Sequence, residues 1–392
     1  MNPERTPTTG ADPRADGAQT VAASRPRPGE LTITRGVCTA FFAFDVGFAV
    51  DLNEAQRLLS QEAPQRETLR HTRRAPKYFE YQPAPVRLAR NARQITVGRF
   101  TTAPVVDALL FDFGAVSISF TIPIEGPATD LLALSDGLYE NAELLAEAQR
   151  TVQELIRLLR PAINKPELAP FVEDYMVFDV DEWTVEGGGA LEAWINANLG
   201  LVARVLRADN QPLSRQEVED ATSCRISYAD NDAALIDWNA ALLFGTDMQD
   251  VSAVLEFANV ELLEMRFLDD QLDRSLSNAY EASQKRDWLG FGGRGGGLRR
   301  IARLQIDSAM LFEGVNNALK LLGDVYLSRV YRLAAVRMHL PDWDASIIRK
   351  LATLESIYQK VNDRQANRRM EVLEWIIILL IAFEVVMSFV RQ

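Results

Sequence analysis

Residues 105–124 read VVDALLFDFGAVSISFTIPI, and this stretch decides the fold that the sequence predicts. Its β-branched and aromatic residues favour strands, and residues 112–114 in the middle have the composition of a turn. The stretch therefore predicts a β-hairpin. Upstream, residues 36–51 (GVCTAFFAFDVGFAVD) also have a strand composition, residues 52–61 are predicted to be helical, and residues 94–100 predict a short strand.

The segments after the hairpin complete an α+β pattern. Residues 128–160 place apolar side chains at helical spacing and end at Pro161, and residues 171–185 return to a strand composition. The order strand, helix, two strands, helix, strand is that of a ferredoxin-like α+β layer, a fold that is compatible with many functions. We assign it to a head domain over residues 31–186, after a leader at 1–30 whose composition predicts disorder.

Residues 187–371 carry no strand signal and are predicted to form a helical stalk domain. Apolar residues recur every three or four positions over 251–276, which predicts one long helix, and a second apolar seam covers 347–361. We expect these helices to pair as an antiparallel or coiled-coil region. The predicted fold class is therefore α+β: a ferredoxin-like head, an all-helical region and one C-terminal transmembrane helix.

The transmembrane prediction rests on residues 372–390, which read VLEWIIILLIAFEVVMSFV. Nineteen helical residues span roughly 28 Å, close to the thickness of the hydrocarbon core of a bilayer. The alternative is a buried core helix. Arg364, Arg368 and Arg369 precede this stretch, and the positive-inside rule then places the bulk of the chain in the cytoplasm.

Three side chains of the predicted anchor are candidates for function. Trp375 suits the headgroup layer, and Glu374 lies near enough to the predicted membrane surface to reach water. Glu384 would lie deep in the bilayer, where a charge is costly, so it is expected to be protonated or hydrogen-bonded to another helix. This favours a homo-oligomer. The alternative is an ion-conducting assembly in which Glu384 lines the pore.

Composition argues against the usual enzyme classes. The chain has 392 residues, two histidines and two cysteines, Cys38 and Cys224, which lie far apart and have no metal-ligand spacing. Sequence motifs of hydrolases, metalloproteases and phosphate-binding loops are absent. Asp179 and Asp181 share one face of a predicted strand, but a solvated acidic edge explains them as well as a metal site does. We therefore predict no enzyme, catalytic residue, metal, cofactor or small-molecule substrate.

The net charge of the whole chain is -12, but one stretch is basic: residues 57–99 carry ten basic residues and three acidic ones. Within it, basic residues run into aromatic ones, a mixture that can hold phosphates and stack on bases, although a solvated basic loop is the simpler interpretation. A glycine-rich loop at 290–300 ends in two arginines and is predicted to be a flexible connector that can contact lipid headgroups. The candidate nucleic-acid or headgroup contacts are Arg70, Arg73, Arg74, Lys77, Arg299 and Arg300.

The C-terminal segment LESIYQKVNDRQANRRMEVLEWIIILLIAFEVV, at 354–386, resembles the ending of the family called required for meiotic nuclear division, a domain of unknown function. In this sequence Asn362, Arg368, Leu373, Glu374, Trp375 and Glu384 match that family's pattern. The family usually places a Pro-Asp-aromatic-Trp segment before the last helix. Here only residues 340–343 (LPDW) follow a helix at 325–338, which leaves the pairing of the helices open.

This resemblance implies a location and a class of role. It implies a single-pass protein of the bacterial inner membrane, related to a eukaryotic branch that supports mitochondrial translation and is thought to anchor ribosomes. It implies no catalytic residue. The sequence therefore predicts a homo-oligomeric, tail-anchored scaffold or tether whose partners are lipid and copies of itself, and the resemblance adds a ribosome or RNA as a candidate partner.

Overall fold

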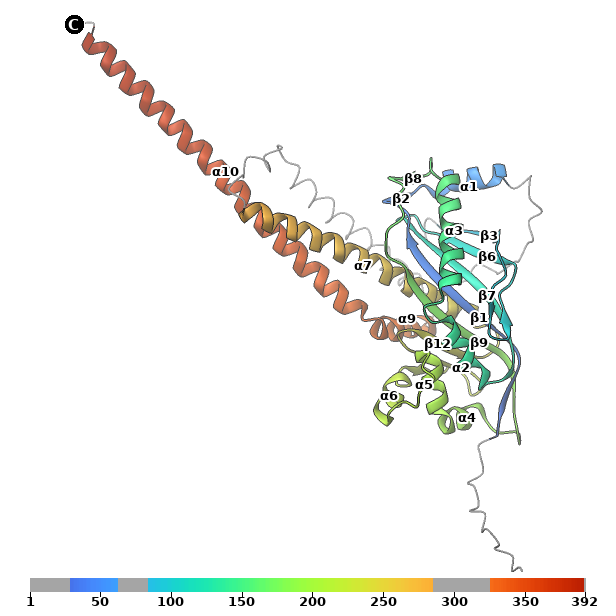
Figure 1. Cartoon of the computed structure of the whole chain (residues 1–392). Helices are drawn as coiled ribbons and strands as arrows, with labels where there is room; N and C mark the ends of the chain where they lie inside the picture. Colours follow the sequence, from blue (N-terminus) through green and yellow to red (C-terminus); the bar gives the residue numbers. More distant parts are fainter. Residues whose placement is uncertain (1–28, 63–83, 285–324, 391–392) are drawn as a thin grey trace, which may run out of the picture.

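A large mixed sheet lies at the centre of the protein (Figure 1). The computed structural model describes residues 29–62, 84–284 and 325–390, and within its helices the side chains of 280–284, 358, 361–373 and 382–390 are not described. Eight strands form the sheet, in the order β10 (Arg225–Ile226), β11 (Ala233–Ile236), β12 (Ala240–Phe244), β9 (Glu173–Val185), β1 (Leu31–Asp45), β7 (Ala115–Pro127), β6 (Val105–Leu110) and β3 (Val86–Asn91).

All neighbouring strands are antiparallel except β12 and β9, which are parallel. The long strand β1 is central, and Ala40 lies between Phe120 of β7 and Met176 of β9. Two short ribbons accompany the sheet: β2 (Ala49–Val50) with β8 (Ile163–Asn164), and β4 (Thr96–Val97) with β5 (Phe100–Thr101). The hairpin predicted over 105–124 is confirmed as β6 and β7.

Strand β1 supplies both hydrophobic cores because successive side chains of a strand point to opposite faces. Phe42 and Phe44 belong to one core, and Phe41 and Ala43 belong to the other. Phe42 meets Phe120 of β7 edge to face, with ring centroids 5.8 Å apart. A sheet that is covered on both faces explains why this strand is apolar without alternation.

Helices cover the two faces of the sheet as separate layers (Figure 1). The first core includes residues of α1 (Leu52–Glu62), α2 (Asp130–Leu138), α3 (Ala142–Leu158), α4 (Leu191–Ala197) and α5 (Leu199–Arg207). The second core includes residues of α7 (Gln249–Gln284), α9 (Val325–Arg337) and α10 (Leu340–Val390). The short helix α6 (Arg215–Ala221) contacts α5.

The helix predicted over 128–160 is two helices. The chain breaks at Glu140, whose φ is 48°, and Asn141 then begins α3. The Asn141 side chain accepts hydrogen bonds from the backbone N–H groups of Glu143 and Leu144, at 3.1 and 3.0 Å. This N-cap satisfies two donors that would otherwise lack partners, and so favours a new helix at this point.

Helices α7 and α10 run side by side away from the sheet, and α10 continues beyond the end of α7 (Figure 1). Lys350 of α10 binds Asp269 and Asp273 of α7, with N–O distances of 2.8 and 2.6 Å. Nearer the sheet, the charge of Asp344 on α10 acts on Glu261 of α7. Contacts therefore advance in the same direction along both helices, which makes the pair parallel and corrects the predicted antiparallel arrangement.

The prediction of a ferredoxin-like head followed by an all-helical region is wrong. Strands β10, β11 and β12 lie beyond residue 187 and extend the sheet that the head residues form. Residues 233–236 (AALI) and 240–244 (AALLF) are buried at every position, so they lack the alternation that identifies a half-exposed strand. A short apolar run of this kind cannot be distinguished from a buried helix by its period.

The prediction of a transmembrane helix over 372–390 is also corrected. Within the part of the chain that the structure describes, no helix has the length and apolar character needed to cross a bilayer. The tail-anchored topology and the inner-membrane location, which depended on this helix, are corrected with it.

Candidate functional site

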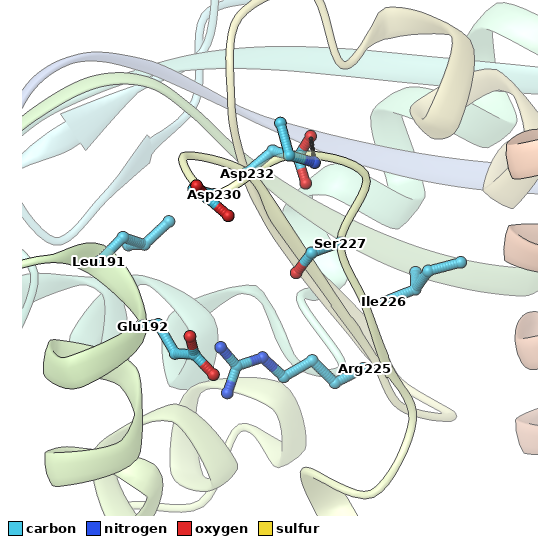
Figure 2. Close-up of a pocket in the computed structure, with 8 residues that line it drawn as sticks. Leu191, Glu192, Arg225, Ile226, Ser227, Asp230 and Asp232 are labelled. Carbon is cyan, nitrogen blue, oxygen red and sulfur yellow. Dashed lines mark hydrogen bonds between the residues drawn. The ribbon is translucent and has the colours of Figure 1, made fainter.

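A polar pocket of about 390 Å³ lies at the β10 edge of the sheet (Figure 2). Glu192 on α4 and Arg225 on β10 extend toward each other across it, and Asp230 projects from the loop above them. The Asp232 carboxylate accepts hydrogen bonds from the backbone N–H groups of Tyr228 and Ala229, at 2.7 and 3.0 Å, and so shapes that loop. The complete lining is Leu191, Glu192, Arg225, Ile226, Ser227, Ala229, Asp230 and Asp232.

This pocket suits binding better than catalysis. Its lining offers carboxylates, one guanidinium group and the Ser227 hydroxyl, but no histidine or cysteine to activate a nucleophile. Arg225 also donates to the Asn196 side chain, with an N–O distance of 2.9 Å. Among the described residues, no group of three or more histidine, cysteine, aspartate or glutamate side chains is arranged to hold a metal ion.

An ion network around Asp237 joins the helical layers at the same end of the sheet. Asp237 is fully buried in the turn between β11 and β12, and it accepts from Nε of Arg207 on α5 at 3.0 Å and from Nε of Arg337 on α9 at 2.9 Å. Both arginines also bind Asp220 of α6. Hydrogen bonding by Arg337 holds the pKa of the exposed Asp220 carboxyl below its usual range. Because every charge here has a partner, we interpret the network as structural.

Several carboxyl groups are buried where α7 packs between the sheet and the other two helices of its layer. Burial raises the pKa of Glu261 to about 7, and Tyr331 of α9 donates its hydroxyl to Glu261 at 2.6 Å. Burial also raises the pKa of Glu173 to about 7, although Arg266 of α7 pairs with it. The third group, Asp45 on β1 with Glu264 on α7, has raised pKa values for the same reason. Such groups cluster at functional sites but also occur in structural networks.

The outer part of α10 presents the most unusual surface among the described residues. Seven consecutive large apolar side chains, at 375–381, are between 47% and 65% exposed. Since successive residues are rotated by about 100° around a helix, seven of them surround it completely. An isolated exposed isoleucine needs no explanation, but a contiguous apolar surface marks a binding site. We take this surface, defined as Trp375, Ile376, Ile377, Ile378, Leu379, Leu380 and Ile381, as the candidate functional site and call it the apolar collar.

Of the residues that the sequence predicted to be functional, the structure places Glu374 and Trp375 next to each other, exposed at the start of the apolar collar. Asp181, from the acidic strand, lies 3.4 Å from Arg35 on β1, which accounts for it as part of a surface ion pair. The remaining predicted side chains lie outside the described residues: Arg70, Arg73, Arg74, Lys77, Arg299, Arg300, Arg364, Arg368, Arg369 and Glu384.

Comparison with known proteins gives one family. The family described as "Uncharacterized protein MJ0711, N-terminal domain" matches residues 35–250, more than half of the chain. The chain belongs to this family. The MJ0711 match begins within β1 and ends at the start of α7, so it covers every strand of the central sheet except β1's first residues. The family is therefore defined by the sheet and its first helical layer, and the α7–α10 pair lies almost entirely outside the match.

A relative in Methanocaldococcus jannaschii, the uncharacterized protein MJ0711 itself, is 19% identical over 259 residues, which cover 64% of this chain and 77% of the relative. No solved structure matches the chain. The resemblance to the family required for meiotic nuclear division is not tested by these matches and stays a prediction.

Sequence reasoning did not single out Asp237, Arg207 and Arg337, and the signal for them was weak. Asp237 is followed by Trp238 between two short apolar runs, which is a turn signature and carries no hint of two arginines from helices far along the chain. Glu261 and Glu264 lie in the long helix predicted over 251–276 but outside its apolar stripe, where side chains are expected to face solvent. Glu261 and the Oε1 atom of Glu264 are buried because α7 is covered on more than one side, which the period of its apolar stripe does not reveal.

Proposed function

We propose that this chain is a non-enzymatic assembly protein whose copies associate through the apolar collar on α10. The single observation that carries the proposal is the exposure of seven consecutive large apolar side chains on a helix that extends beyond its neighbour α7. A helix that is apolar all round needs to be surrounded by other groups. The part of the chain that contains the eight-stranded sheet is then held at one end of a stalk made of several helices.

The proposed occupant of the apolar collar is a second copy of the chain. The exposed area of the seven side chains is on the order of 800 Å² per chain, which matches one side of a standard protein interface. Another copy supplies a surface of the same length and character, and closed symmetric association is the common arrangement for proteins in solution. Because the collar surrounds the helix, a bundle of more than two helices covers it better than a pair does.

The proposal keeps the prediction of a homo-oligomeric scaffold and drops the membrane anchor. The alternative of an ion-conducting assembly lined by Glu384 depended on a membrane helix and is dropped with it. The predicted ribosome or RNA contact at Arg70, Arg73, Arg74 and Lys77 lies outside the described residues and stays a prediction. The polar pocket at β10 is a surface by which the oligomer can bind a partner.

Two variants of α10 test the proposal with a matched control. Ile378 and Ile348 lie on the same helix and are 53% and 54% exposed, but only Ile378 belongs to the apolar collar. Light scattering after size-exclusion chromatography gives the particle mass of the full-length wild type, Ile378→Lys and Ile348→Lys. We expect an oligomer for the wild type and Ile348→Lys, and a shift toward the 43.8 kDa monomer for Ile378→Lys.

Two outcomes contradict the proposal. The first is an unexpected particle mass, which is either a monomeric wild-type protein or an Ile378→Lys variant with an unchanged oligomeric mass. The second is that lipid covers the apolar collar in place of a second copy. In that case the wild type floats with phosphatidylcholine vesicles, remains monomeric in mild detergent, and loses flotation in the Ile378→Lys variant.

A further inference from the structure

The polar pocket at β10 lies between that strand and α4, on one face of the sheet. The side chains of Arg225 and Ser227 extend from β10 toward the pocket, whereas the side chain of Ile226 extends the other way and belongs to the second core (Figure 2). Successive residues of a strand alternate between its faces, so this division follows from the strand itself. On the opposite wall α4 presents Glu192, and its neighbour Leu191 is anchored in the first core. Both walls are therefore held in place by the cores of the protein.

Two carboxylates of this pocket have no partner in the part of the chain that the structure describes. Glu192 and Asp230 are exposed and take part in no ion pair or side-chain hydrogen bond there. Asp232 differs from them, because its carboxylate accepts from two backbone N–H groups of its own loop. The guanidinium group of Arg225 donates to Asn196 and keeps further N–H donors for a ligand.

Unpaired surface carboxylates are common, but these two border one enclosed volume. The pocket measures about 390 Å³, which lies within the range of sites that hold small molecules. Its available charges are the guanidinium group of Arg225 and the carboxylates of Glu192 and Asp230, so one negative charge is in excess. A ligand with two cationic groups and one carboxylate would neutralise all three.

The positions of these charges narrow the choice of ligand further. Glu192 and Arg225 extend toward each other from opposite walls, which brings an acceptor of cations and a donor to anions to the same end of the pocket (Figure 2). An α-amino acid carries its ammonium and carboxylate groups on one carbon atom, so it can bind both residues at once. Asp230 projects from the loop at the other end, where a cation at the tip of the ligand's side chain would lie.

We propose that the polar pocket binds a free basic amino acid, of the class of lysine, arginine and ornithine. Arg225 binds the α-carboxylate, Glu192 binds the α-ammonium group, and Asp230 binds the cation of the side chain. Leu191 provides apolar surface for the methylene groups between them. The lining has no histidine or cysteine to activate a nucleophile, so the ligand is held without being converted. This inference does not depend on association through the apolar collar, which lies on a different helix.

Isothermal titration calorimetry of the full-length protein with three ligands tests the recognition of each cation. L-lysine is compared with L-norleucine, which lacks the side-chain ammonium group, and with Nα-acetyl-L-lysine, which lacks the α-ammonium group. We expect L-lysine to bind about tenfold or more tightly than either analogue, because each analogue loses one charge-assisted hydrogen bond.

Two variants assign the two cations to their carboxylates. Asp230→Asn should weaken binding of L-lysine about tenfold or more and remove its preference over L-norleucine. Glu192→Gln should weaken binding of L-lysine to a similar extent and remove its preference over Nα-acetyl-L-lysine. Because both side chains are exposed and unpaired, the variants should keep the wild-type fold, which circular dichroism checks. Glu154→Gln removes a carboxylate from an exposed ion pair on α3 and is the matched control, with wild-type affinities.

Three outcomes overturn the proposal. The first is that L-lysine, L-arginine and L-ornithine all give no heat of binding at millimolar concentration. The second is that L-lysine and L-norleucine bind the wild type equally tightly. The third is that Asp230→Asn and Glu192→Gln bind L-lysine as tightly as Glu154→Gln does.

Discussion

Replacing Asp237 with asparagine is expected to loosen the contact between the two helical layers. Asp237 is the fully buried acceptor that Arg207 of α5 and Arg337 of α9 share, and these helices contribute to different layers. Asparagine has nearly the same volume, so the change removes a charge without creating a cavity. Its amide group can accept from only one side and turns an N–H donor toward the other guanidinium group.

The expected loss in the free energy of unfolding is about 3 kcal/mol. Removing one partner of a buried ion pair costs about 3–5 kcal/mol, because the remaining charge is left without compensation. The two arginines are 15% and 13% exposed and keep Asp220 as a second partner, which places the cost at the lower end of that range. The hydrogen bond from the Trp238 backbone N–H to the side-chain oxygen, 2.9 Å long, can be kept in the variant.

Urea denaturation of the wild type and Asp237→Asn, followed by circular dichroism at pH 7, measures this difference. Asp130→Asn is the matched control, since Asp130 pairs with Arg99 at 2.8 Å but both side chains are well exposed, and such pairs contribute at most about 1 kcal/mol. A loss for Asp237→Asn that is no larger than the loss for Asp130→Asn would refute the argument that burial makes this network strong.

Three further changes have expected outcomes that follow from single observations. Glu261 has a pKa of about 7 in the folded protein and an ordinary pKa when unfolded, so the folded state binds more protons between these two values. The free energy of unfolding of the wild type should therefore fall as the pH rises from 5 to 8. Urea titrations of Glu261→Gln should show a fall over the same pH range that is smaller by up to about 3 kcal/mol. Asn141→Ala removes the N-cap of α3 and should cost about 1 kcal/mol in the same assay, whereas Asn141→Ser should cost little; equal costs would contradict the capping role. Gly114→Ala should be strongly destabilising, because φ at Gly114 is +104° and a Cβ would lie 1.9 Å from the backbone oxygen of Gly47. Gly98 has a φ of +60° and open space around it, so Gly98→Ala should lower the free energy of unfolding, measured by thermal unfolding, by only about 1 kcal/mol.

The sequence predicted the local elements of the first half of the chain well. The hairpin of β6 and β7, the helix α1 and the strand β9 follow from turn residues and apolar periodicity, which act over a few neighbouring residues. The long helix α7 was also predicted, because a stripe of apolar residues over 251–276 has only one simple interpretation. These elements depend on local physical preferences.

The sequence did not predict how the elements join. Strands β11 and β12 were missed because they are buried on both faces, and the parallel direction of α7 and α10 was missed because an apolar stripe identifies a face without giving a direction. The apolar stretch over 372–390, which contains the apolar collar, was recognised from the sequence, but its length of 19 residues led to the prediction of a membrane helix. The burial of Asp45 at the end of β1 depends on the packing of β1 against α7, which begins more than 200 residues later in the chain.

The particle mass of the full-length wild-type protein, measured by sedimentation equilibrium over a wide range of protein concentrations, tests the central claim most directly. Association through the apolar collar predicts a mass that is a multiple of 43.8 kDa and falls toward 43.8 kDa on dilution. A mass of 43.8 kDa at every concentration would show that the collar joins no second copy and would contradict the proposed function.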